Sequence, residues 1–170
     1  MGNYRNLDHD FIERTMQLIT QYDHLYHQFP FDQQYNYTLL LNCLLGTIVM
    51  PKEKLYSHIP NPKITRKLKA EMGLKESEIS DDYEFLRDLI HAMRHSIAHF
   101  SFNIISDNNN FLIDRVEFRT DAKHGSLLIA SFRSRELLPF LRYYADWIRS
   151  NLLERKKSNT KTNPIKKLGR

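Results

Sequence analysis

The sequence predicts a mainly α-helical protein with a small antiparallel β insert between two of its helices. Two observations carry this prediction. Apolar residues recur at helical spacing along most of the chain, whereas between residues 102 and 132 they fall into short runs that alternate with polar ones. The 170 residues, 41% of them hydrophobic, are enough for one domain with a buried core.

Two long helices are expected at the start of the chain. The first covers residues 7–29 and is broken by Pro30. The second covers residues 33–50 and stops at Pro51. Because residues 39–50 are apolar on nearly all sides, this helix should lie in the middle of the core. The same run is too short to cross a bilayer.

A short basic helix is expected over residues 63–72, with Gly73 at its end. Its cations either contact a phosphate backbone or form only a solvated face. A longer amphipathic helix is expected over residues 81–100, with Asp81 and Asp82 at the end where acids are favourable. The apolar side of this helix should be buried, and it consists of Tyr83, Leu86, Leu89, Ile90, Met93, Ile97 and Phe100.

The period of the pattern then changes to that of strands. Residues 102–105, 111–119 and 127–132 are expected to form short antiparallel strands. Residues 107–110 and 121–126, rich in Asp, Asn and Gly, supply the turns between them. One face of this sheet should be wet, because apolar and charged residues alternate in the second strand.

The last helix is expected over residues 135–155, so that residues 1–155 form one domain and residues 156–170 a disordered basic tail. The formal net charge of +5 is concentrated at this end. From Arg149 onwards there are eight Lys or Arg and one acid, a charge of +7, so the remaining residues sum to −2. Any phosphate site in the folded body must therefore be local.

The single cysteine, Cys43, rules out an intrachain disulfide and fits a reducing compartment. Residues 1–10 are polar and lack the order of a secretory signal. We therefore expect a cytoplasmic protein that does not contact a membrane.

A polar stripe runs along the helix predicted over residues 81–100. Arg87, His91, His95 and His99 follow one another around the axis at steps of about 40°, opposite the apolar side. Arginine holds phosphate with a fork of donors, and histidine exchanges a proton near neutral pH. Arg94 lies beside Arg87 and about 140° from His99 on a straight helix. Either the helix is distorted there, or a second copy of the chain completes the site.

Other functions of these residues remain open at this point. His91, His95 and His99 recur every four residues and, with Asp88, could ligate a metal, although three successive turns rarely converge on one ion, so no metal is expected. His99 could serve only to cap the helix end. The aromatic residues that either stack bases or belong to the core or a dimer interface are Tyr35, Tyr37, Tyr143, Tyr144 and Trp147.

The segment from Arg94 to His99 resembles the signature of HEPN-domain proteins. It has an arginine, a polar residue at His95, three further residues and a histidine. The order of helices around it is also similar, and the resemblance covers most of residues 7–153. It implies a HEPN-like helical bundle, from which the β insert of residues 102–132 departs.

The resemblance implies a homodimeric, metal-independent endoribonuclease without a cofactor. His99 would act as general acid or base, Arg94 would neutralise charge on the phosphoryl oxygens, and His95 would orient the site or carry a second proton. Arg87 and His91 would help to bind substrate. The expected partners are RNA, a second copy and an antitoxin protein, in phage defence or a toxin system. The alternative is a non-catalytic dimer that binds RNA or a protein.

Overall fold

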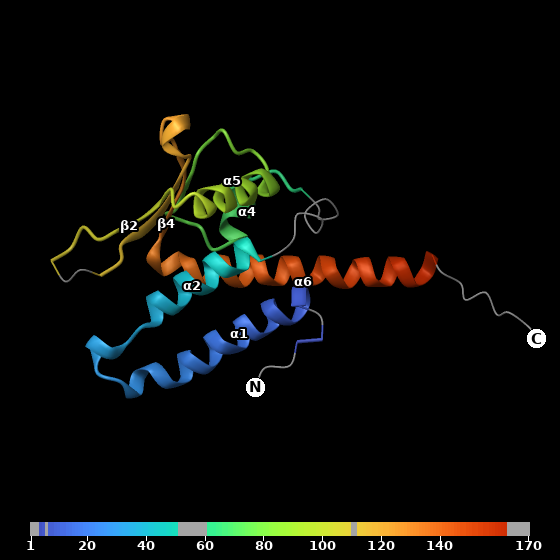
Figure 1. The fold of residues 1–170 in the computed structure, drawn as a ribbon, viewed down its shortest axis with the longest axis horizontal. Helices are drawn as coiled ribbons and strands as arrows, with labels where there is room; N and C mark the ends of the chain where they lie inside the picture. The colour runs from blue at the N-terminus through green and yellow to red at the C-terminus, as the bar shows by residue number, and fades with distance from the viewer. Residues whose placement is uncertain (1–3, 6, 51–60, 110–111, 163–170) are drawn as a thin grey trace, which may run out of the picture.

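The computed structural model describes residues 4–5, 7–50, 61–109 and 112–162. In Figure 1, α1, α2 and α6 lie beside one another, α5 and α4 lie on one side of them, and the strands stand at one end. The α-helices of the described residues are α1 (Leu7–Leu25), α2 (Asn36–Val49), α4 (Arg66–Glu71), α5 (Leu86–Ala98) and α6 (Leu137–Thr162). The mainly α-helical fold predicted from the sequence is confirmed.

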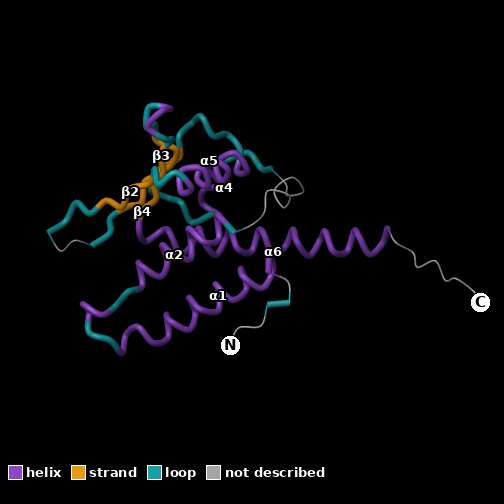
Figure 2. Tube along the Cα trace, viewed as in Figure 1, coloured by secondary structure: helices purple, strands orange, loops and turns teal. Residues whose placement is uncertain are grey.

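The strands form one antiparallel sheet in the order β1-β4-β3-β2. Figure 2 shows β2, β3 and β4 together, in orange, at one end of the helices. Their bounds are β1 (Glu78–Ile79), β2 (Phe102–Ile105), β3 (Arg115–Arg119) and β4 (Leu128–Arg133). The predicted β insert between α5 and α6 is therefore present. The sequence did not predict β1, which precedes α5, because a strand of two residues offers no alternation to recognise.

The sheet and the helices share one hydrophobic core. Phe118 of β3 contacts Phe132 of β4, with ring centroids 5.8 Å apart. Phe132 contacts Phe140 of α6 at 4.8 Å, and Phe140 stacks on Tyr144 at 6.1 Å. All four side chains are fully buried, so this chain of aromatic rings fastens the sheet to α6. Tyr144 thus belongs to the core and cannot stack on a base.

Several element ends differ from the sequence prediction. The helix expected over residues 81–100 begins only at Leu86, because Tyr83 N–H donates to Ser80 O and closes a turn before it. Helix α6 runs to Thr162 and covers residues 156–162, where the sequence predicts a disordered tail. Lys and Arg are good helix formers, so a basic segment can extend an existing helix. The rest of the predicted tail lies outside the described residues.

A buried carboxylate holds α4, β1 and α6 together. Glu136 is 6% exposed, and its carboxylate accepts hydrogen bonds from the backbone N–H groups of Lys75 (3.0 Å), Glu76 (3.0 Å) and Ser77 (2.9 Å) and from Ser77 Oγ (2.6 Å). Burial raises the pKa of the Glu136 carboxyl, but these hydrogen bonds outweigh it, and the pKa lies below its ordinary value. The segment before β1 is thereby fixed beside β4.

Within the part of the chain that the structure describes, none of the helices combines the length and the apolar character needed to cross a bilayer.

Candidate functional site

The start of α5 is held by the segment that precedes α4. A helix leaves its first N–H groups without partners in the helix, and here no side chain caps them from the adjacent position. Instead Leu86 N–H donates to Pro62 O at 3.0 Å, and Arg87 N–H donates to Asn61 Oδ1 at 2.9 Å. These two bonds fix where the candidate site helix begins.

The two sides of α5 differ as the sequence predicts. Leu86, Leu89, Ile90 and Met93 are fully buried against the core. On the other side, the polar stripe faces outward, with Arg87 and Arg94 half-buried and with His91, His95 and His99 exposed. The candidate site is therefore an accessible surface of the helix.

Helix α5 ends in a Schellman motif, which normally places a glycine in the left-handed conformation. Ser101 N–H donates to Ser96 O at 2.8 Å, and Phe100 N–H donates to Ile97 O at 3.1 Å. The left-handed position is taken by Phe100, with φ of 52°. The expectation that Phe100 is buried is wrong: it is 87% exposed, because it lies beyond the helix end and points away from the core. His99 is the last residue before this reversal.

Ser96 fastens the end of α5 to the sheet. Its side chain is fully buried, and its hydroxyl donates to Ser101 O at 2.9 Å and accepts from Arg119 N–H of β3 at 3.2 Å. Arg119 N–H also donates to Ser101 O at 2.9 Å. The short segment between His99 and β2 is therefore tied down on both sides.

Two histidines of the predicted site meet on this surface. The rings of His95 and His99 are in contact, with centroids 4.2 Å apart. A third group comes from the connection between β3 and β4, where Asp121 Oδ2 lies 3.8 Å from His95 Nε2. The same carboxylate accepts from His124, whose Nδ1 is 2.5 Å and whose backbone N is 3.0 Å from Asp121 Oδ1. We call His95, His99, Asp121 and His124 the histidine cluster.

Asp121 is ionised over a wide pH range. The side-chain hydrogen bond from His124 lowers the pKa of the Asp121 carboxyl below its ordinary value, and the backbone N–H of His124 and the charges of His124 and His95 act in the same direction. A carboxylate beside an imidazole favours the protonated ring and fixes its orientation. Asp121 therefore places a negative charge beside Nε2 of His95.

Asp121 and His124 are functional candidates that sequence reasoning missed. The sequence shows the turn, and Asp121 indeed caps the short 3₁₀ helix Ala122–His124 through the backbone N–H of His124. It gives no indication that this turn lies over α5. That follows only from the pairing of β3 with β4 and from the docking of β3 on the end of α5.

On an ideal helix Arg94 and His99, five positions apart, would lie about 140° from each other around the axis. In the structure Arg94 belongs to α5, and His99 is the residue that caps its C-terminal end. His95 is the residue between them in angle. The described residues contain no group of three or more His, Cys, Asp or Glu side chains arranged to hold a metal ion.

The helical bundle, with Arg94 and His99 late in α5, is consistent with a HEPN domain that carries a small β insert. The model of the family HEPN pEK499 p136 matches residues 1–155, and the chain belongs to this family. Neither a curated protein nor a solved structure matches the chain.

Proposed function

We propose that this protein is a metal-independent endoribonuclease that cleaves single-stranded RNA in a cleft shared by two copies of the chain. The observation that carries the proposal is the contact of His95 with His99 beside the Asp121 carboxylate, on the same exposed helix end as Arg94. Two imidazoles within reach of one phosphodiester can transfer the two protons that RNA cleavage requires.

The chemistry is an attack of the ribose 2′-hydroxyl on the adjacent phosphorus. One imidazole takes the 2′-hydroxyl proton as the P–O bond forms. A protonated imidazole gives a proton to the 5′-oxygen as the other P–O bond breaks. The products are a 2′,3′-cyclic phosphate and a 5′-hydroxyl end. One of the two residues His95 and His99 would act as the base and the other as the acid, while Arg94 would neutralise charge on the phosphoryl oxygens.

The shared cleft follows from the angle between Arg94 and His99. Side chains that diverge by about 140° on an ideal helix point to different sides of it, which favours a phosphate held by Arg94 and His99 of different chains. Two copies related by a two-fold axis would bring Arg94 of one chain toward the histidine cluster of the other. Arg87 and His91, on the same stripe, would then bind the RNA backbone on either side.

The test is cleavage of an unstructured single-stranded RNA in EDTA. Wild-type protein should yield 2′,3′-cyclic phosphate and 5′-hydroxyl ends and should leave DNA of the same sequence intact. Arg94→Ala and His99→Ala should each lower the rate by at least about 100-fold. The matched controls His24→Ala and Arg142→Ala remove the same side chains from other exposed positions. Binding of RNA without cleavage would favour the non-catalytic alternative.

The dimer has a test of its own. Inactive Arg94→Ala and His99→Ala proteins, mixed and exchanged, should regain part of the activity if one site takes its arginine and histidine from different chains. A monomeric mass in sedimentation, or no recovery in the mixture, would contradict the shared cleft. A role as a toxin or in phage defence predicts growth arrest on expression that His99→Ala abolishes.

A further inference from the structure

The basic segment around α4 encloses a cavity of about 490 Å³, away from the histidine cluster. This volume is in the range of small-molecule sites. Its lining consists of three cations, three aliphatic side chains and a hydroxyl, namely Arg66, Lys69, Lys75, Ile64, Ala70, Leu74 and Thr65. No acidic side chain lines it. The charged side chains of the cavity are therefore all positive, so the cavity favours an anionic ligand.

The cations of the cavity differ from their neighbours in their partners. Lys63 and Lys67, in the same segment but outside the lining, form ion pairs with Glu84 at 2.9 Å and with Glu71 at 3.8 Å. Among the described residues, no carboxylate lies within ion-pair distance of Arg66, Lys69 or Lys75. Within the described part of the chain, their charge is therefore available to an anionic ligand.

Part of the lining is fixed in place before any ligand arrives. Lys69 is half-buried, and its Nζ donates to Ser77 O at 3.0 Å, which holds the ammonium at the wall of the cavity. An ammonium has three N–H donors, so others remain for a ligand. Thr65 Oγ1 accepts from Leu68 N–H at 3.1 Å and keeps its own proton for an acceptor. Arg66 and Lys75 are exposed at the rim.

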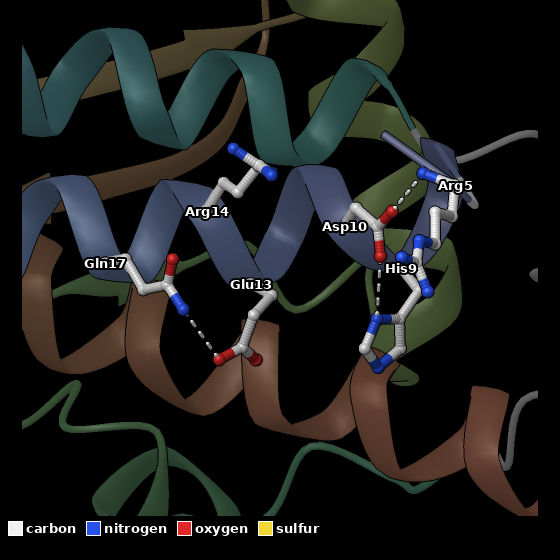
Figure 3. Close-up of a pocket in the computed structure, with 6 residues that line it drawn as sticks. All are labelled: Arg5, His9, Asp10, Glu13, Arg14 and Gln17. Atoms are coloured by element: carbon white, nitrogen blue, oxygen red, sulfur yellow. Dashed lines mark hydrogen bonds and ion pairs between the residues drawn. The ribbon is translucent and has the colours of Figure 1, made fainter. Parts of the chain in front are cut away.

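Two other hollows of the described residues have mixed charge. The cavity of about 420 Å³ on α1 (Figure 3) is lined by cations and by two carboxylates, Asp10 and Glu13, which are hydrogen-bonded to its own walls. The hollow of about 220 Å³ on the outer face of the sheet is lined by Glu76, Glu78 and Glu117 as well as by arginines. Neither would attract a phosphate as the α4 cavity does.

The α4 cavity is joined directly to the helix that carries the candidate site. Ile64 N–H donates to Glu84 O at 2.7 Å, and Lys63 and Phe85 form a β-bridge, so one wall lies beside the start of α5. From Leu86 to His95 the helix rises by about 14 Å. An RNA strand a few nucleotides long spans that distance, within the site sizes of single-strand binding grooves.

We propose that this cavity binds a phosphate group of the RNA strand at a distance from the cleaved bond. The choice of RNA over a free phosphorylated molecule rests on the proposed function. No aromatic ring lines the cavity, so it holds the sugar–phosphate backbone and is indifferent to base sequence. It gives a slightly acidic folded body a local affinity for the strand and fixes the strand's path along α5.

The test measures RNA binding at equilibrium, by fluorescence anisotropy of a labelled 12-nucleotide single strand, with the full chain carrying His99→Ala to prevent cleavage. The variant Arg66→Ala/Lys75→Ala removes the two rim cations and leaves the anchored Lys69 in place. The matched control is Lys63→Ala/Lys67→Ala, which makes the same change in net charge in the same segment. Circular dichroism and thermal unfolding establish that each protein is folded.

The cavity variant should bind RNA about tenfold more weakly at 0.1 M salt, and the slope of log K against log salt should fall by about 0.7, the value for one neutralised phosphate of a single strand. The control should change affinity by less than about threefold, because its cations are already paired. An equal loss of RNA affinity in both variants would show that only the net charge matters and would overturn the proposal. An unchanged RNA affinity of the cavity variant would also overturn it.

A second arm separates the strand from a free ligand. AMP and inorganic phosphate are titrated into ¹⁵N-labelled protein while the amide signals of residues 64–75 are followed. The proposal is supported if AMP and phosphate cause only small shifts of these signals, while the 12-nucleotide RNA causes larger shifts at a far lower concentration. Tight binding of AMP, with RNA affinity independent of the cavity, would overturn it. These experiments measure binding and need no catalysis. The protein could therefore fail as a nuclease and still bind RNA through this cavity, and the reverse result is equally distinguishable.

Discussion

Asp121 Oδ2 lies 3.8 Å from His95 Nε2, although one residue belongs to a turn of the sheet and the other to α5. The exposed fractions of the two side chains, 18% for Asp121 and 49% for His95, show that the carboxylate is largely covered while the imidazole remains open to a ligand. The sheet thus supplies a carboxylate to the helix that carries Arg94 and His95.

This relationship predicts that Asp121→Asn slows RNA cleavage by about fivefold, because the amide removes the negative charge beside His95 and a half-exposed charge contact contributes modestly. The initial rate of RNA cleavage is measured for wild type and variant at the same pH. Asp107→Asn, which removes a carboxylate paired with Arg115 elsewhere on the sheet, is the control. Equal rates for both variants would remove Asp121 from the mechanism.

Gly73 gives a prediction about stability. It has φ of 76°, and a Cβ built on it would lie 2.3 Å from Pro139 Cβ. Gly73→Ala should therefore lower the free energy of unfolding by roughly 3 kcal/mol, from overpacking and backbone strain together. Gly125→Ala is the matched control, because Gly125 has φ of 81° but only ordinary contacts, with Leu127 at 3.9 Å. It should cost about 1 kcal/mol in urea unfolding. Similar losses at both positions would contradict the clash with Pro139.

At Phe100 a substitution by glycine is expected to stabilise the protein. It occupies a left-handed position where its exposed ring gains little packing. Phe100→Gly should raise the free energy of unfolding by about 0.5–1 kcal/mol, since relief of backbone strain exceeds the extra entropy of glycine in the unfolded chain. Urea unfolding of the two proteins measures the difference. A less stable variant would mean that the ring has a stabilising contact in solution, for example with a second copy.

Glu136 makes the stability depend on pH. Its pKa is lowered in the folded state, so its contribution is complete above the ordinary glutamate pKa and is lost as the pH falls through the folded value. Glu136→Gln should cost about 2–3 kcal/mol at pH 7, because several N–H groups lose a charged acceptor. The gap between wild type and variant should narrow below about pH 4.5. A gap independent of pH would show that the carboxylate charge is not the stabilising feature.

Much of the fold could be predicted from residue patterns. The helical stretches and three of the strands were expected, because each has a period that its own residues display. The turn before α5 and the exposure of Phe100 were not, since a backbone hydrogen bond of Ser80 and a left-handed residue at a helix end override the apolar spacing. Propensity and periodicity describe an element's interior better than its ends.

Some residues of the candidate site could likewise be predicted from the sequence, and others could not. Arg94, His95 and His99 could be singled out because they lie within six residues of one helix and its cap. Asp121 could not, because its position over His95 depends on two strand pairings and on the docking of β3 at the helix end. A contact between residues distant in sequence leaves no mark in the spacing of either segment.

The hydrogen bonds of the Ser96 hydroxyl couple the opening of α5 to the opening of β3. Because Arg119 N–H is shared between Ser96 Oγ and Ser101 O, its proton can exchange with solvent only when β3 parts from the end of α5. The last turn of the helix and the middle of the sheet should then open together, as one cooperative unit. Slow exchange of the Arg119 and Ser101 amides at matching rates would mean that the histidines keep their geometry for as long as the sheet stays closed.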